Sequence, residues 1–314
     1  MGIALGRPRT GGVLVLALAL ALLPLFLPNA YYFEVAANAA INAFVVVGLN
    51  LLIGYAGQIS LGHAGFFAIG AYAVAILPTR WEVPTLAAIP IGAALAGLVA
   101  FAVGRPILRL RGHYLAMATL GFGMLIALVA NNERELTGGP DGMTVPTLVV
   151  FGERLRGAVT WYWIAAVMLV LGTWLALNLI DSPTGRALRA LHDSEVAAEG
   201  AAIDVARYKL TAFVVSAVFA SLGGSMLACF ARFVSPAKAG FLYSIELVTM
   251  TVLGGMGSTF GGILGAAVLT VLPQFLTLFH EYEHAILGLI LMVCLIFLRE
   301  GLVPGLLRRL GRER

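Results

Sequence analysis

The chain has 314 residues, of which 60% are hydrophobic and only 11% are charged, and its formal net charge is +4. An ordinary soluble domain carries about 25% charged residues, so this composition excludes one and indicates a polytopic membrane protein. The small positive charge reflects arginines that we expect at the cytoplasmic face, as argued below, and does not indicate nucleic-acid binding. The 37 glycines fit helices that pack closely through small residues.

The first apolar run, residues 11–27, follows Arg7 and Arg9 and has the charged and apolar regions of a secretory signal peptide. Residues 28–31, Pro-Asn-Ala-Tyr, make a poor small-x-small cleavage site. We therefore favour a retained first span over a cleaved signal.

Nine further apolar runs have lengths at or somewhat below the roughly 20 residues that cross a bilayer. Together with the first run they predict an all-α fold of about ten transmembrane helices, forming a single membrane domain over residues 1–314. The runs cover residues 35–53, 64–77, 85–104, 114–130, 160–180, 210–230, 244–253, 262–279 and 285–298.

The distribution of basic residues predicts the orientation. If the spans alternate from an inner N-terminus, 14 of the 20 Lys and Arg residues lie inside and six lie outside. Because cytoplasmic loops are enriched in Lys and Arg, this bias places both termini and residues 181–209 in the cytoplasm.

Residues 181–209 are the most highly charged stretch of the chain. Each unpaired charge costs about 2.5 kcal/mol or more at mid-bilayer, so the stretch must lie in water between two spans. Pro183 suits the first turn of a short helix over residues 185–191. Asp193 is a candidate cap for a second short helix, with Gly200 as its stop. We interpret this segment as a docking element for a cytosolic partner; the alternative is an ordinary solvated loop.

The chain contains no P-loop. That motif ends in Gly-Lys-Ser/Thr, and its lysine reaches the phosphates of the nucleotide. The two lysines here, Lys209 and Lys238, follow a tyrosine and an alanine. Any ATP hydrolysis that drives this protein must therefore take place on another polypeptide.

Residues 48–72 combine many glycines with polar side chains at membrane depth. Irregular backbone is tolerated there only when it is buried in protein or faces a water-filled path. A path-lining bend and tight helix packing both remain open. Upstream of this stretch, Asn38 and Asn42 are spaced four residues apart and share one helix face, which fits a path lining or an interhelical hydrogen bond. The candidate path residues are Asn38, Asn42, Asn50, Gln58, Ser60 and His63.

Three other features have a functional and a plain interpretation. Glycine-rich residues 253–265 fit part of a cytoplasmic docking surface or a tight turn between helices. Residues 131–143 carry the turn sequence Gly-Gly-Pro-Asp-Gly and fit an external contact or a structured loop. Glu246 lies early in its apolar run, and we expect it at the membrane interface rather than as a buried functional carboxylate.

Residues 280–284, His-Glu-Tyr-Glu-His, match the zinc-protease pattern. A catalytic zinc also needs a third ligand and an open position, and the candidate third ligand is Asp141 in another loop. A membrane metalloprotease is therefore a remote alternative, and we expect no metal and no cofactor. Cys229 and Cys294 lie inside apolar runs and are expected to be inert thiols.

Four stretches of the chain, taken in order, resemble the motifs of a known family. They are GYAGQISLGHAGFFAIGAY, the TGG-x-DG loop, SPTGRALRALHDSEVAAEGAAI and VLGGMGSTFGG. Together they resemble the LivM-type permeases of branched-chain amino acid ABC transporters, over roughly residues 38–298. The resemblance implies an importer permease fold with inverted internal repeats, in a bacterial inner membrane, and no enzymatic activity.

The resemblance also implies partners: a second, similar permease, two cytosolic ATPases and a periplasmic binding protein, within a lipid bilayer. Its coupling helix matches the charged segment, where the candidate ATPase contacts are Arg186, Arg189, His192, Asp193, Glu195 and Glu199. The substrates implied are branched-chain or related amino acids. A stand-alone secondary transporter is the main alternative, but apart from Glu246 the spans have almost no ionisable residue to couple an ion.

Overall fold

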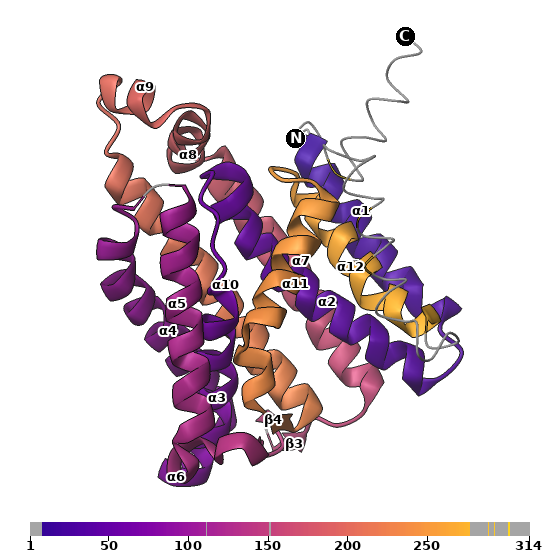
Figure 1. Cartoon of the computed structure of the whole chain (residues 1–314). Helices are drawn as coiled ribbons and strands as arrows, with labels where there is room; N and C mark the ends of the chain where they lie inside the picture. The colour runs from indigo at the N-terminus through magenta and orange to yellow at the C-terminus, as the bar shows by residue number, and fades with distance from the viewer. Residues whose placement is uncertain are drawn as a thin grey trace.

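The computed structural model describes residues 8–110, 112–150 and 152–276, together with residues 288, 292 and 301, and these residues fold as an α-helical bundle (Figure 1). The helices before the charged segment are α1 Pro8–Leu22, η1 Leu23–Phe26, α2 Ala30–Asn50, η2 Leu51–Tyr55, α3 His63–Trp81, α4 Thr85–Ile107, α5 His113–Asn132, α6 Arg134–Thr137, η3 Gly139–Asp141 and α7 Ala158–Asp181. The later helices are α8 Pro183–Asp193, α9 Glu195–Gly200, α10 Val205–Ala231, η4 Pro236–Ala239, α11 Phe241–Gly254 and α12 Thr259–Leu276.

Within the described part of the chain, six helices are long and apolar enough to cross a membrane: α2 with η2, α3, α4, α5, α7 and α10. Three apolar helices are shorter, namely α1 with η1, α11 and α12. Each of these nine corresponds to one of the ten expected runs, and the run at residues 285–298 lies outside the described residues. A polytopic membrane fold is therefore confirmed.

Helix α10 is the centre of the bundle and packs against α2, α3 and α4. Glycine permits its close approach to α3: a Cβ on Gly70 would overlap the Ser221 carbonyl oxygen, and one on Gly224 would overlap the Phe67 carbonyl oxygen. The hydroxyl of Ser225 donates a hydrogen bond to the Gly70 carbonyl at 3.0 Å. Small residues thus let two backbones touch where lipid supplies no hydrophobic driving force.

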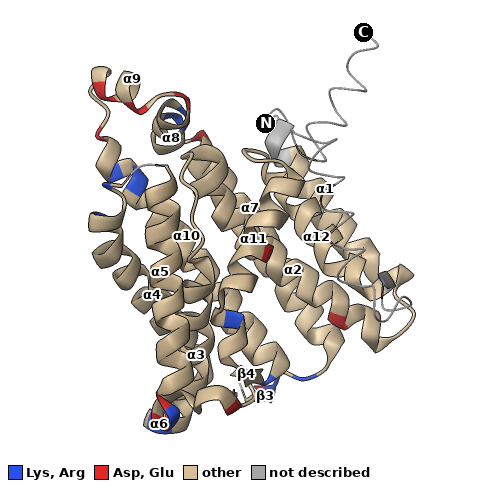
Figure 2. Ribbon diagram, viewed as in Figure 1, with Lys and Arg blue, Asp and Glu red and all other residues tan. Residues whose placement is uncertain are grey.

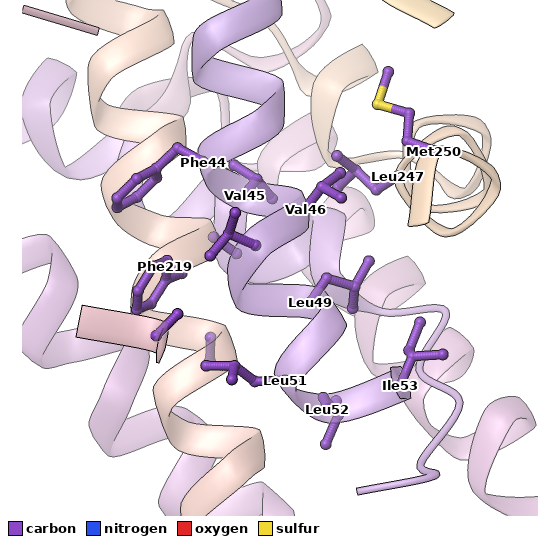
Figure 3. Close-up of a cluster of buried hydrophobic side chains, with 14 of the residues drawn as sticks. Phe44, Val45, Val46, Leu49, Leu51, Leu52, Ile53, Phe219, Leu247 and Met250 are labelled. Carbon is purple, nitrogen blue, oxygen red and sulfur yellow. The ribbon is translucent and has the colours of Figure 1, made fainter. Parts of the chain in front are cut away.

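Helix α2 supplies much of the buried core (Figure 3). The ring of Phe44 stacks on Phe219 of α10 with 4.8 Å between centroids. Val46 lies toward Leu247 and Met250 of α11 in the close-up. Because α2 also packs against α7 and α12, it joins the α3–α4–α5–α10 group to the remaining helices.

The backbone breaks between α2 and α3. The π-helical turn η2 ends α2, and residues 56–62 then run without helix to His63. His63 contacts Ser216, which lies 11 residues into α10 and therefore about 16 Å from its start. The non-helical segment thus reaches about half-way into a hydrocarbon core of roughly 30 Å, and α3 begins inside the bundle.

Helices α8 and α9 lie at one end of the bundle, which we call the coupling end (Figure 1). The first described turn of α1 lies at the same end. The opposite end holds two short antiparallel sheets, β1 Met143–Thr144 with β4 Phe233–Val234, and β2 Val149–Val150 with β3 Glu153–Arg154. Coloured by charge, the chain shows acidic and basic residues gathered mainly at these two ends (Figure 2).

The loop after α5 is structured at that opposite end. Thr137 donates its hydroxyl hydrogen bond to the Ala130 carbonyl at 2.7 Å, and Gly138 and Gly139 have positive φ angles that favour glycine. The amide of Val145 donates to the Arg232 carbonyl at 2.9 Å. The plain interpretation of the Gly-Gly-Pro-Asp-Gly turn is therefore confirmed: it fixes a loop against the end of α10.

Candidate functional site

The charged segment forms the two short helices expected from its sequence. Ser182 caps α8 by accepting the Gly185 amide at 3.4 Å, with Pro183 at the first helical position. The expected cap on the second helix is wrong: Ser194, one residue after Asp193, accepts the Ala197 amide at 3.2 Å. Asp193 instead ends α8, because burial of Leu188 and Leu191 against the bundle extends that helix by two residues.

The outward side of α8 and α9 is polar and exposed. The exposed candidates for ATPase contact are Arg186, Arg189, His192, Asp193 and Glu199. Arg186 and Arg189 donate to the carbonyls of Asp181 and Ile180, at 3.4 and 3.3 Å. Val196 is 73% exposed between them and Glu199. The two helices therefore present a mixed charged and apolar surface held by a buried apolar base.

Glu195 joins this surface to the membrane helices. Its Oε1 lies 2.5 Å from Nζ of Lys209 in α10, and the Lys209 side chain is only 3% exposed. The same oxygen accepts a hydrogen bond from Nε2 of Gln58 at 3.4 Å. Gly57 completes the contact, since a Cβ there would lie 3.0 Å from Nδ1 of His192. The start of the non-helical segment is thus bonded to α9.

A charged crevice of about 730 Å³ lies beside this ion pair. Helices α4, α9 and α10 line it, and Arg105 stacks its guanidinium 4.2 Å from the Phe101 ring centroid. Glu195 and Lys209 form one of its walls.

The second glycine-rich stretch is a turn between α11 and α12 at the coupling end. Asn50 holds this turn with both ends of its amide: Nδ2 donates to the Ser258 carbonyl at 2.8 Å, and Oδ1 accepts the Gly257 amide at 3.0 Å. Asn50 is 1% exposed. A Cβ on Gly54 would overlap the Gly257 nitrogen, so the turn seals directly against η2.

The lower end of the non-helical segment is fixed by side chains rather than by backbone pairing. His63 joins Ser60 through Nδ1 at 2.8 Å and Ser216 through Nε2 at 2.7 Å. The amide of Leu61 donates to Thr119 Oγ1 at 3.1 Å, and that of Ala64 donates to Ser244 Oγ at 3.0 Å. The segment is therefore bonded to α5, α10 and α11 at mid-depth.

One side of this segment stays open. Gln58, Ser60 and His63 point into the bundle and are nearly buried, whereas Gly57 and Ile59 are exposed, Ile59 by 52%. Among the described residues the structure therefore brings these three candidate path residues together behind an exposed strip of backbone.

Asn38 and Asn42 play separate parts. Asn42 donates to Thr270 Oγ1 at 3.0 Å and accepts the Tyr243 hydroxyl at 3.0 Å, which is the interhelical bonding anticipated for this face. Asn38 bonds the Glu34 carbonyl of its own helix and lines a pocket of about 280 Å³ between α2, α3 and α10.

Two charged residues lie in or beside this region: Lys238, which the sequence interpretation did not single out, and Glu246 on α11, which it expected at the membrane interface. Lys238 lines the pocket, with Nζ 4.6 Å from the ring centroid of Tyr243. Glu246 lies one turn beyond Tyr243 on α11 and is exposed. It stands eight residues, about 12 Å, from the Gly254 end of that helix. The sequence signal for this position was the shortness of the apolar run that contains Glu246. That signal did not fix the depth at which the helix starts.

The described residues contain no group of three His, Cys, Asp or Glu side chains placed to hold a metal ion. The His-Glu-Tyr-Glu-His motif and Cys294 lie outside the described residues. Cys229 is a buried free thiol, as expected.

The fold and the site define a class: a multi-pass membrane protein in which two short polar helices are bonded to a broken span. Residues 31–295 match the family described as branched-chain amino acid transport system / permease component. The chain belongs to this family, so it is a transport permease subunit and not an enzyme.

Similar proteins of named function agree with this family. The chain is 34% identical to the high-affinity branched-chain amino acid transport system permease protein LivM of Escherichia coli (strain K12), over 93% of this chain and 74% of the relative. It is 24% identical to the corresponding LivH of Salmonella typhimurium, over 83% and 90%. A probable LivM of Methanocaldococcus jannaschii is 22% identical over 67% and 66%. No solved structure matches the chain.

Proposed function

We propose that this chain is one of two permease subunits of an ATP-driven importer of branched-chain or closely related amino acids, in a bacterial inner membrane. Family membership and the LivM relatives support the transport class and the substrate class. A total near ten helices and an inverted internal repeat belong to the same proposal.

We infer the position of the translocation path from the exposed side of residues 56–62. This backbone lies about half-way through the bilayer, and Ile59 is 52% exposed there. Non-helical backbone cannot face lipid, because its polar groups would lose their hydrogen-bond partners. The face formed by α5, residues 56–62 and α11 therefore turns toward a second permease, with the water-filled path between the two subunits. Gln58, Ser60 and His63 shape this wall, and Asn38, Asn42 and Asn50 fix the helices around it.

The coupling end is the cytoplasmic end in this proposal. It carries Lys209 and the exposed arginines of α8, as expected from the bias of basic residues toward the cytoplasm. Two cytosolic ATPases supply the hydrolysis for which this chain has no P-loop, and one of them contacts α8 and α9. A periplasmic binding protein meets the opposite end, where β1 pairs with β4.

The experiment reconstitutes the chain with its second permease and both ATPases into proteoliposomes, and adds leucine-loaded binding protein outside. We expect leucine uptake that requires internal ATP and stops when a P-loop lysine of the ATPase is replaced. Uptake that proceeds without ATP would contradict the proposal.

A secondary transporter is the second candidate, because exposed Glu246 on α11 gives the described spans an ionisable group. Proteoliposomes holding this chain alone, with a proton or sodium gradient imposed, separate the two functions. We expect no gradient-driven uptake.

A further inference from the structure

The structure places two opposite charges, Glu246 and Lys238, close to buried residues of the transmembrane helices. Glu246 lies on the exposed side of α11 together with Leu242 and Ile245. A carboxylate costs several kcal/mol at the bilayer centre, so such a group normally faces protein or water. Helix α11 has 14 residues and rises about 21 Å, too little to cross the bilayer, so its start lies inside the membrane region.

Lys238 lies at the same level of the bundle. Its ammonium stands 4.6 Å from the Tyr243 ring centroid, and that ring lies 4.8 Å from the ring of Phe67, one turn beyond His63. Tyr243 in turn bonds Asn42 in the middle of α2. Lys238 is therefore an exposed residue of η4, in the connection from β4 to α11, that lies beside buried residues of α2 and α3.

The two charges are neighbours that do not pair. Tyr243 is their common neighbour, with Nζ of Lys238 4.6 Å from its ring centroid and Glu246 three residues later on α11. Among the described residues, however, no nitrogen–oxygen contact within 4.0 Å joins them, unlike Glu195 and Lys209. They flank Tyr243, with Glu246 one helical turn beyond it, or about 5.4 Å along the axis. A separate molecule with one charge of each sign fits this arrangement better than a direct ion pair does.

We propose that Lys238 and Glu246 form a recognition site for a zwitterionic amino acid on the translocation path, where Lys238 binds the α-carboxylate and Glu246 binds the α-ammonium. This inference rests on the proposed function. Charge-assisted hydrogen bonds of about 2.8 Å at each end of the ligand would span the gap between the two side chains.

The walls of the neighbouring pocket suit an aliphatic side chain. The pocket of about 280 Å³ is lined by Phe67, Ala71, Leu227 and Ala228, with Asn38 and Lys238 as its polar members. An amino acid held by its charged groups at Lys238 and Glu246 can place an apolar side chain against these residues. The site binds the common zwitterion, and the pocket accepts side chains of leucine size.

The test uses the complete complex in proteoliposomes, with Lys238→Gln and Glu246→Gln. We expect each variant to lower leucine uptake at low substrate concentration roughly 10- to 100-fold, the effect of losing one charge-assisted hydrogen bond. Binding-protein-stimulated ATPase activity should stay within about twofold of wild type, because the coupling end is untouched. Lys238→Arg and Glu246→Asp keep the charges and should retain most of the uptake.

Arg80→Gln and Glu135→Gln are matched controls, since both residues are exposed and lie outside this pocket. Unchanged uptake in both test variants would overturn the site. The site would also be overturned if a variant lost uptake and no longer copurified with the second permease. In that case the charges would pair permanently with that subunit. Absence of ATP-driven uptake in the wild type would contradict the proposed function instead.

Discussion

The carboxylate of Glu195 lies 2.5 Å from the ammonium of Lys209, and this contact joins the short helix α9 to the central helix α10. Lys209 is 3% exposed and Glu195 is 23% exposed, so the two partners are not equivalent. Removing the carboxylate leaves a buried ammonium with less compensation. Removing the ammonium leaves a carboxylate that still accepts the hydrogen bond from Gln58, on a side chain that is partly exposed.

We therefore expect Glu195→Gln to destabilise the protein by about 2–3 kcal/mol, below the range for fully enclosed pairs, and Lys209→Met to destabilise it less. Thermal unfolding in detergent measures both changes. Asp193→Asn, an exposed neighbour on α8, is the control and should change little. Equal losses in the two test variants would contradict the asymmetry.

The crossing of α3 and α10 tests the role of small residues. A Cβ on Gly224 would overlap the Phe67 carbonyl oxygen, so Gly224→Val should separate the helices and destabilise the fold by about 1–3 kcal/mol. Gly121 of α5 has nothing within 4 Å of an added Cβ, so Gly121→Ala should be neutral or slightly stabilising. The melting temperatures of the two variants are compared. If Gly224→Val melts at the same temperature as Gly121→Ala, the close packing of α3 and α10 is refuted.

Asn50 holds the turn between α11 and α12 by two hydrogen bonds. Asn50→Ala leaves a partly buried carbonyl and a partly buried amide without these partners, at a cost of about 1–3 kcal/mol. Hydrogen exchange at Gly257 should become faster. Asn38→Ala removes only a bond within α2 and should leave that exchange rate unchanged.

The outward face of α8 should govern ATPase association. Arg186→Glu with Arg189→Glu reverses two exposed charges while leaving Leu188 and Leu191 buried, so the fold should persist. Affinity purification of the permease should then recover less ATPase. Arg80→Glu, at an exposed position ending α3, should recover as much ATPase as the wild type. Full recovery with the double variant would remove α8 from the docking surface.

The sequence predicted those features that depend on local composition. Nine apolar runs became helices, and the charged segment became two short ones, because capping and burial act within a few residues. The choice between Asp193 and Ser194 as a cap could not be made, since both residue types cap helices and the packing of Leu191 decides where α8 ends.

Features that depend on distant segments could not be predicted. The partners of Asn50 lie about 200 positions later in the chain, and Glu195 meets Gln58 from 137 positions away. Likewise, no local pattern shows that α11 starts inside the bundle, so the neighbourhood of Lys238 and Glu246 emerges only from the packing of Tyr243 on Phe67.

Helix α10 is a single piece of 27 residues whose first turns hold Lys209 and whose end leads into β4. A stiff rod of this kind passes a tilt at one end to the other with little loss. Displacing α9 would therefore shift the strand pair on the far side of the membrane, and a load placed on that pair would press back on α9. Such reciprocity is required of any two sites linked through one two-state element, and it would couple an event at one end of the bundle to an event at the other.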